Sequence, residues 1–340
     1  MQQIVLKQPG EFFSHDVPQP EISGSDEALV RVQRIGVCGT DLHAFTGKQP
    51  FFDYPRVLGH ELGVEVVEVA GNDRGIAVGD LCAVEPYFTC GSCIACRSGK
   101  SNCCRSMRVL GIQMDGAMSP YFVVPVEKLH KSATLSSDEL ALVEMLAIGA
   151  HANERALPQP NENVLVIGAG PIGLGVMQFA KARGSNVIAM DISDDRLEFC
   201  QSQMGVAETV NPTQGDAEEQ LRSKLGGDLP TVLFDATGNP RSMNGTFELV
   251  DHGGKIVFVG LFQGDVTFND PNFHRRELTL MATRNALPET FGSVLRLLES
   301  GAVDTAPWIT HRLGLGEVVD QFAAIQGTPG LVKAMIEVEA

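Results

Sequence analysis

Five of the eight cysteines of this 340-residue chain stand in one short stretch. Four of them follow the pattern Cys-x2-Cys-x2-Cys-x7-Cys, at Cys90, Cys93, Cys96 and Cys104. Four thiolates on one loop form a closed tetrahedral zinc site with no position left for water, which indicates a structural metal. Cys103 is the neighbour of the last cysteine, and it is an alternative fourth ligand.

A second set of metal-binding residue types is dispersed along the chain. Cys38 follows one strand pattern, His60 and Glu61 begin another, and Glu144 stands in a helical run. A thiolate, an imidazole and a carboxylate with one open position describe a catalytic zinc site. Taken singly, each has an ordinary structural interpretation: a buried small side chain, a core histidine or a helix-surface acid.

A glycine-rich turn points to a nucleotide. The G-x-G-x-x-G pattern at 168–173 follows a strand pattern at 163–168 and opens a helical pattern at 171–184. Its residues are Gly168, Gly170, Pro171, Ile172 and Gly173. Such a turn lets a pyrophosphate approach the start of the helix closely. A glycine-rich turn without a ligand is the alternative.

Asp191 ends the next strand pattern, at 186–191, where an acid accepts the ribose hydroxyls of a dinucleotide. A carboxylate there repels a 2′-phosphate, so we expect NAD rather than NADP. Arg196 either covers the adenine or is a solvated cation on the helix face. Val259, Gly260 and Leu261, at the end of a later strand pattern, are also assigned to the cofactor.

These residues need two kinds of scaffold. Up to about residue 150 the chain contains short strand patterns, such as 27–37 and 63–70, broken by turns. From about Asn161 strands alternate with helical patterns such as 194–204 and 240–251, which predicts βαβ crossovers. We therefore expect an α/β chain: a doubly wound parallel Rossmann sheet of about six strands beside a smaller β-rich domain.

Composition limits the classes of partner. The net charge is −16, from 26 Lys and Arg against 42 Asp and Glu. This surface repels phosphate backbones and anionic lipid, so nucleic acid and membrane are poor partners. The N-terminus lacks a signal-peptide pattern, and clustered thiols suit a reducing compartment, so we expect a cytoplasmic protein.

The motifs together resemble the zinc-dependent medium-chain alcohol dehydrogenase family over essentially the whole chain. The resemblance rests on GVCGTDLH, LGHELGVEV, the cysteine lobe (about 88–106), LVEMLAIGAHA and VLVIGAGPIGLG. Glu61 after the zinc-binding His60, and Glu144 in place of a cysteine ligand, are similar to the sorbitol and threonine dehydrogenase branch. The resemblance implies a GroES-like catalytic domain at 1–150, an NAD-binding domain at 151–285, and a return to the catalytic domain at 286–340.

The resemblance also implies roles. Two zinc ions per subunit are expected, one structural and one catalytic, the latter held by Cys38, His60 and Glu144 or Glu61. Zinc acts as a Lewis acid on a secondary hydroxyl, and hydride passes to NAD. Thr40 and His43 match the family's proton relay. Glu61 ligates zinc, exchanges with water, or orients His60. A homo-oligomer is expected, a tetramer rather than a dimer.

Segments 46–61, 235–265 and 270–291 resemble bacterial hexonate 5-dehydrogenases, which oxidise L-galactonate, L-gulonate or L-idonate to keto-acids. We therefore expect a small polyhydroxylated substrate, with a pocket formed by Phe51, Phe52, Tyr54, Phe262, Arg284 and Asn285. Arg284 can clamp a sugar-acid carboxylate. The alternatives are a threonine or polyol dehydrogenase, and a non-catalytic zinc- and NAD-binding sensor, against which the Thr40 and His43 relay argues.

Overall fold

The computed structural model describes residues 1–50 and 52–338. Phe51, assigned above to the substrate pocket, lies outside the described residues. The chain divides into two compact units, Met1–Glu144 with Leu287–Ala340 (unit 1) and Met145–Ala286 (unit 2). No helix in the described part of the chain combines the length and apolar character that a membrane crossing requires.

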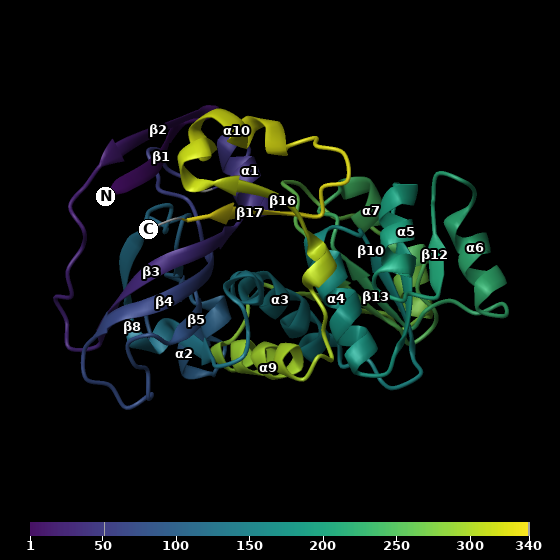
Figure 1. Cartoon of the computed structure of the whole chain (residues 1–340). Helices are drawn as coiled ribbons and strands as arrows, with labels where there is room; N and C mark the ends of the chain where they lie inside the picture. Colours follow the sequence, from purple (N-terminus) through teal and green to yellow (C-terminus); the bar gives the residue numbers. More distant parts are fainter. Residues whose placement is uncertain (51, 339–340) are drawn as a thin grey trace. The chain divides into compact units, whose positions relative to one another are not determined.

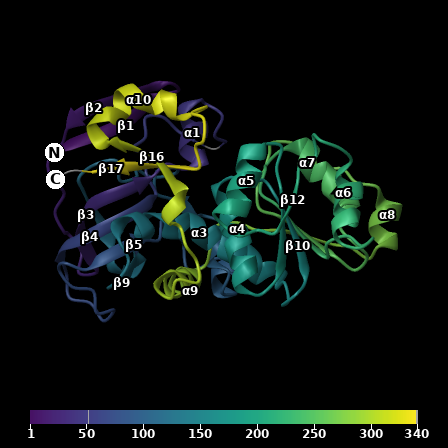
Figure 2. The same ribbon diagram turned by 45° about the vertical axis from the view of Figure 1, so that its right-hand side comes forward.

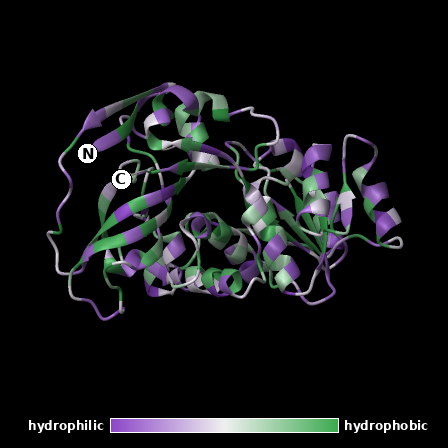
Figure 3. Cartoon of the chain, in the orientation of Figure 1, coloured by the Kyte–Doolittle hydropathy of each residue, from purple (hydrophilic) through white to green (hydrophobic). Residues whose placement is uncertain are grey.

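Unit 1 is built on a seven-stranded sheet of order β16-β17-β3-β4-β5-β9, with β8 paired to β3. Its strands are β3 (Glu27–Gly36), β4 (Glu61–Val69), β5 (Leu81–Val84), β8 (Tyr121–Pro125), β9 (Leu129–Ser132), β16 (Ile309–Gly314) and β17 (Lys333–Glu337). Strands β3 and β4 alternate apolar and polar residues (Figure 3), so their apolar side chains join the buried core of this unit. The C-terminal strand β17 pairs with β3 from the first part of the chain, and β16 pairs with β17 (Figure 1).

Short elements complete unit 1. Two further strand pairs are β1 (Gln2–Gln8) with β2 (Glu11–Asp16), and β6 (Tyr87–Phe88) with β7 (Arg108–Val109). The helices are α1 (Gly39–Phe45), α2 (Ile94–Arg97), α9 (Pro288–Glu299) and α10 (Val318–Ile325), with single turns η1 (Ser101–Cys103), η2 (Val126–Lys128), η4 (Ala306–Trp308) and η5 (Leu315–Glu317). Helix α3 (Ser137–Ala156) begins in unit 1 and continues into unit 2.

Unit 2 contains the predicted doubly wound sheet, with six parallel strands in the order β12-β11-β10-β13-β14-β15. The strands are β10 (Asn163–Ile167), β11 (Asn186–Met190), β12 (Glu208–Val210), β13 (Val232–Asp235), β14 (Lys255–Phe258) and β15 (Thr279–Ala282). The helices are α4 (Pro171–Ala182), α5 (Asp194–Ser202), α6 (Ala217–Lys224), α7 (Pro240–Gly245) and α8 (Asp270–Arg275). Figure 2 shows α4 and α5 alongside this sheet. The fold class expected from the sequence is confirmed.

One predicted helix is shorter than its pattern. The pattern 240–251 predicts a continuous helix, but α7 ends at Gly245 and a single 3-10 turn, η3 (Thr246–Glu248), follows. Glycine has low helix propensity, and the Thr246 hydroxyl donates to the Met243 carbonyl at 2.8 Å. The glycine favours the end of the regular helix.

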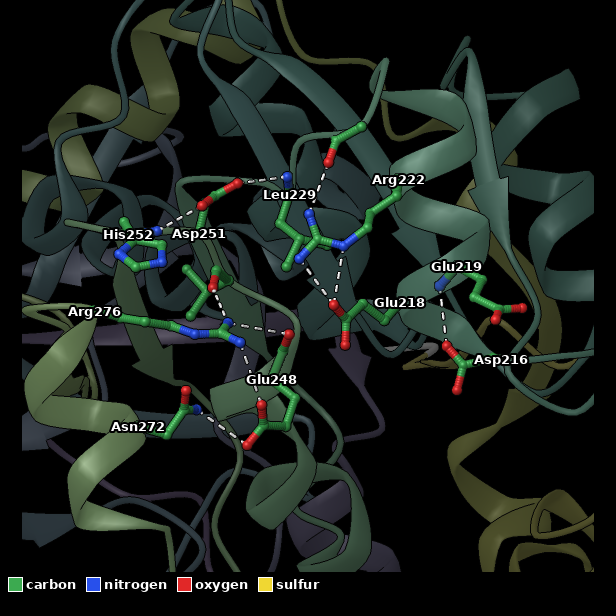
Figure 4. A network of polar contacts seen from close by, with 12 residues as sticks. Asp216, Glu218, Glu219, Arg222, Leu229, Glu248, Asp251, His252, Asn272 and Arg276 are labelled. Carbon is green, nitrogen blue, oxygen red and sulfur yellow. Dashed lines mark hydrogen bonds and ion pairs between the residues drawn. The ribbon is translucent and has the colours of Figure 1, made fainter.

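Polar contacts secure the loops before β13 and β14 (Figure 4). The carboxylate of Asp251 accepts a hydrogen bond from the Leu229 N–H at 2.8 Å. The guanidinium of Arg276 is buried and donates to the Val250 carbonyl at 2.9 Å, and it pairs with Glu248. These contacts precede the strands, whereas the glycine-rich turn follows β10. They therefore stabilise the amino ends of the parallel strands, whereas nucleotides bind at the carboxyl ends.

Candidate metal centres and nucleotide site

The sulfur atoms of Cys90, Cys93, Cys96 and Cys104 all lie within 4.8 Å of one another. The Sγ atoms of Cys93 and Cys96 are 3.5 Å apart, as are those of Cys90 and Cys104. With Zn–S bonds of about 2.3 Å, the edge of a tetrahedral site is about 3.8 Å, so a small expansion accommodates zinc. Cys104 is buried and belongs to the cluster, whereas Cys103 is exposed and lies outside it.

The turn that carries Cys90 favours the metal-binding form of its thiol. Backbone N–H groups of Ser92 and Cys93 lower the pKa of Cys90 to about 6. Zinc binds thiolates and not thiols. The lowered pKa of Cys90 therefore reduces the free energy needed to form its metal-binding thiolate.

The ligand atoms of Cys38, His60 and Glu61 form a second cluster, again within 4.8 Å of one another. The register of β3 and β4 explains it: Gly36 lies opposite Glu61, so the residues just beyond the two strand ends come together. His60 is 3% exposed and Glu61 is 1% exposed. Glu144, on α3, lies outside this group of three, but its buried carboxylate interacts electrostatically with His60 and Glu61.

This second cluster has the donor set and the unmet bonding of a metal site. Among the described residues, the buried carboxylate oxygen Glu144 Oε2 beside this cluster has no hydrogen-bond partner, whereas Glu61 Oε2 forms an ion pair with Lys333. An unpaired buried polar group costs about 1–3 kcal/mol, and a charged one more. A divalent cation relieves that cost for the atoms it binds, and zinc accepts thiolate, imidazole and carboxylate together. The residues present therefore fit zinc.

Asp41 lies beside His60. It is fully buried; its Oδ2 accepts the Cys38 N–H at 2.9 Å, and its Oδ1 is 3.7 Å from His60 Nδ1. Burial opposes the charged imidazole, but the carboxylate of Asp41 and the thiolate of Cys38 outweigh it and raise the pKa of His60 well above its usual value. With Nδ1 facing Asp41, Nε2 is the nitrogen available to a metal.

Lys333 is the partner of Glu61. Its ammonium is 3% exposed and forms an ion pair with Glu61 Oε2. Burial acts to lower the pKa of Lys333, but the Glu61 carboxylate outweighs it and raises that pKa. A Cβ atom at Gly36 would collide with the same oxygen, so the glycine leaves the space that the carboxylate occupies.

Tyr87 is the partner of Glu144. Its hydroxyl donates to Glu144 Oε1 at 2.5 Å, and its side chain is buried. Burial and the neighbouring carboxylate raise the pKa of Tyr87 well above its usual value. Burial also raises the pKa of Glu144.

The residues expected to form the relay lie on α1, directly after Cys38. The Thr40 side chain is partly buried and His43 is exposed. One of the expected pocket aromatics contacts this helix: the Tyr54 hydroxyl donates to the Ala44 carbonyl at 2.5 Å, and the ring of Phe52 is 4.8 Å from the ring of Tyr54.

In unit 2 the glycine-rich turn joins β10 to α4. Gly168 has a φ of 95°, a conformation that favours glycine. A Cβ atom at Gly173 would collide with the Gly168 carbonyl oxygen, so this position also requires glycine. Gly170 caps α4, with Pro171 in its first turn and Ile172 next, partly buried. The start of a helix is thereby left open to an anionic group.

Asp191 lies beside this turn. Its Oδ2 accepts the Ala169 N–H at 2.7 Å, and its Oδ1 accepts the Ser193 N–H at 3.0 Å. The Arg196 guanidinium is 3.9 Å from Asp191 Oδ2. These contacts hold the carboxylate where the sequence places the ribose-binding acid.

The remaining predicted residues of unit 2 differ in exposure. Leu261 is 75% exposed, and Val259 and Gly260 are partly buried. Phe262 packs against the hydrophobic core of this unit. Arg284 is exposed, and Asn285 has a φ of 49°.

Sequence reasoning gave no role to Asp41, Lys333, Tyr87 or Gly36. Asp41 stands inside the GVCGTDLH motif, and its position next to a ligand was a usable signal. Lys333 interrupts the apolar run 331–336, and a lone lysine among apolar residues of a buried strand indicates a charged partner. Only the pairing of β17 with β3 identifies that partner as Glu61. For Tyr87 and Gly36 there was no such signal.

Comparison with known proteins assigns the class. Residues 24–134 match the family described as "Alcohol dehydrogenase GroES-like domain", and residues 171–300 match "Zinc-binding dehydrogenase". L-galactonate-5-dehydrogenase of Escherichia coli (strain K12) is 42% identical over 324 residues, which cover 95% of this chain and 94% of that protein. The chain therefore belongs to the zinc-type alcohol dehydrogenase family, an oxidoreductase family, as the motifs predicted.

Solved structures agree with this assignment. The alcohol dehydrogenase RspB from Escherichia coli CFT073, solved with NADH, superposes with a TM-score of 0.90 at 29% identity and covers 99% of each chain. A zinc-binding dehydrogenase from Sinorhizobium meliloti 1021, solved with NADP, gives a TM-score of 0.92 at 28% identity, covering 99% of this chain and 98% of that one. The relatives thus include proteins solved with each nicotinamide cofactor.

Proposed function

We propose that this protein oxidises a secondary hydroxyl of a hexonate sugar acid (L-galactonate, L-gulonate or L-idonate) at C5, with NAD as hydride acceptor. The observation that carries the proposal is the cluster of Cys38 with the buried His60 and Glu61, and Glu144 nearby, in a chain 42% identical to an L-galactonate-5-dehydrogenase. Zinc bound there supplies a Lewis acid that lowers the pKa of the substrate hydroxyl. A second zinc in the cysteine lobe is structural.

The chain's own residues perform the remaining tasks. Asp41 fixes the ring of His60, and Lys333 neutralises Glu61. Thr40 and His43 stand on one helix, and the exposed imidazole of His43 can release the reaction's proton to solvent. Arg284 is the proposed cation for the substrate carboxylate, because guanidinium binds carboxylate in a bidentate pair.

The turn at Gly168–Gly173 and Asp191 are proposed to hold NAD. The carboxylate supports NAD over NADP, since it repels a 2′-phosphate, although one relative was solved with NADP. Replacing Asp191 by Ser should raise kcat/KM with NADP relative to NAD. Equal use of both cofactors by the wild type would overturn this part of the proposal.

The experiment is NAD reduction against a panel of L-galactonate, L-gulonate, L-idonate, L-threonine, sorbitol and galactitol. We expect one hexonate to have the largest kcat/KM and Cys38→Ser to abolish its turnover. Preference for threonine or a polyol would contradict the sugar-acid assignment and leave the dehydrogenase chemistry standing. No turnover, with zinc and NAD both bound, would favour the sensor interpretation.

Assembly and location belong to the same proposal. Strand β15 ends the unit 2 sheet and is largely exposed, with Leu280 37% exposed, so its free edge suits pairing with a second copy in a homo-oligomer. Light scattering should show a dimer or tetramer that Leu280→Lys dissociates. The thiolates of the lobe suit the reducing cytoplasm.

A further inference from the structure

The carboxylate of Glu144 has two oxygens in different situations. Oε1 accepts a hydrogen bond from the Tyr87 hydroxyl at 2.5 Å. Oε2 is buried and has no hydrogen-bond partner among the described residues. A buried carboxylate oxygen without a partner is costly. A further group that binds Oε2 would remove this free-energy cost.

The residues around Glu144 identify what that group is. The Glu144 carboxylate interacts electrostatically with His60, Glu61 and Lys333. Lys333 already pairs with Glu61. Because Lys333 is paired with Glu61, we expect a metal cation held by Cys38 and His60 to bind Glu144 Oε2.

We propose that Tyr87 is a positioning residue for the metal cluster: its hydroxyl holds Glu144 Oε1, so that Oε2 alone is offered to the metal. The proposal shares with the proposed function only the assignment of this cluster as a metal site. A carboxylate oxygen that accepts a short hydrogen bond is a weaker metal ligand, so we expect the metal to bind mainly through Oε2. One coordination position of a tetrahedral ion is thereby kept free for substrate.

The surroundings of Tyr87 keep its hydroxyl in place. Tyr87 lies on β6, opposite Val109 of β7. The cysteine lobe is the chain segment that connects these two strands. The ring of Tyr87 meets the edge of Phe291, with centroids 6.0 Å apart at 74°. Phe291 in turn stacks on His130. The strand pair at the base of the lobe thus also positions the group that orients Glu144.

The test is Tyr87→Phe, which removes the hydroxyl and retains a ring to pack against Phe291. The matched control is Tyr121→Phe, the same change on β8 in the same unit. Each protein is loaded with Co²⁺, and the signal of the cluster is defined as the part that Cys38→Ser loses. Metal affinity is measured by competition with a chelator, and unfolding by heat.

We expect Tyr87→Phe to weaken metal binding at the cluster by about 10–100-fold, the usual effect of losing such a supporting contact. The cobalt absorption should also fall as Glu144 becomes free to bind through both oxygens, which raises the coordination number. Tyr121→Phe should change neither quantity. Unaltered cobalt absorption and affinity in folded Tyr87→Phe would overturn the proposal.

Tyr87→His separates positioning from packing, because imidazole can donate a hydrogen bond but fills the ring space poorly. A positioning role predicts that His restores part of the affinity lost in Phe. A packing role predicts that His binds metal less well than Phe, and that result also overturns the proposal. These readouts need no substrate, so a failure of the hexonate assignment would leave them intact.

Discussion

The two candidate metal-binding clusters of unit 1 are built in opposite ways. The lobe takes four sulfur atoms from a single loop, and of these cysteines only Cys104 is buried. The second cluster (Cys38, His60 and Glu61), together with the neighbouring Glu144, is here called the deep cluster. Its residues come from the segment after β3, the start of β4 and the middle of α3, and His60, Glu61 and Glu144 are at most 4% exposed. A local loop holds the first, whereas tertiary structure holds the second.

The difference in donor sets implies a difference in role. Four thiolates complete a tetrahedron and leave no place for a substrate. The deep cluster contains two carboxylates, and each already has a partner. Lys333 pairs with Glu61 and Tyr87 donates to Glu144, so these contacts restrict which oxygen can bind a metal. We therefore expect damage to the lobe to reduce stability, and damage to the deep cluster to reduce activity.

The largest expected effect is that of Cys38→Ser. Loss of a metal-binding thiolate should lower kcat/KM by more than about 100-fold. This exceeds the loss of activity usually seen when a residue that only contacts a metal ligand is removed. The melting temperature should stay near that of the wild type, because the surrounding core is unchanged. Steady-state kinetics and calorimetry measure both. Cys200→Ala, a buried thiol in unit 2, is the control and should retain activity.

Cys96→Ser should show the reverse pattern. Removing one lobe thiolate weakens a structural zinc site, which contributes folding free energy directly. Thermal unfolding should shift down by more than roughly 2–4 °C, equivalent to about 1 kcal/mol or more. Cys103→Ser, an exposed neighbour outside the cluster, should leave unfolding unchanged. Equal shifts in both variants would show that Cys103 shares the fourth position.

A smaller effect is expected from Gly36→Ala. The added Cβ collides with Glu61 Oε2 and must displace the carboxylate from Lys333. Overpacking of this kind costs about 1–3 kcal/mol, measured by denaturant unfolding. Gly39→Ala is the matched control, because a Cβ there meets no atom within 4 Å. Similar losses in both variants would contradict the tight fit of Glu61.

The smallest effect concerns the start of α3, the helix that carries Glu144. Asp138 pairs with Arg312 at 2.6 Å and with Arg34 at 2.8 Å. Burial acts to raise the pKa of Asp138, but the Arg312 and Arg34 contacts outweigh it and lower that pKa. The folded pKa is below the unfolded one, so the stabilisation is complete above about pH 4 and disappears as pH falls through the folded pKa.

Asp138→Asn should therefore lose at most about 1 kcal/mol of unfolding free energy near neutral pH, as is usual for partly exposed pairs. The difference from wild type should shrink in acid. Urea unfolding at several pH values measures it. A difference that grows as the pH falls would contradict the assigned pairing.

Local features could be predicted from the sequence, and those set by tertiary structure could not. The lobe spacing and the turn at Gly168–Gly173 depend on neighbours in the chain, and the alternation of strands and helices gave the Rossmann sheet that the structure confirms. The partners of the glutamates depend on strand pairing: Lys333 approaches Glu61 because β17, near the C-terminus, lies beside β3.

Phe262 illustrates the same limit. Its sequence context predicts a substrate-pocket residue, and this stays a prediction; its partly buried ring packs against the core of unit 2, a contact that periodicity does not show. Side-chain contacts of this kind become visible only in the folded chain.

The most direct test is the zinc content per chain, measured together with hexonate oxidation on the same samples. The wild type should hold about two zinc ions, and Cys38→Ser should hold about one, remain folded and be inactive. Cys96→Ser should lose the other zinc and melt at a lower temperature. The central claim would be contradicted if Cys38→Ser kept the full zinc content, or if it oxidised the hexonate at the wild-type rate with half the zinc.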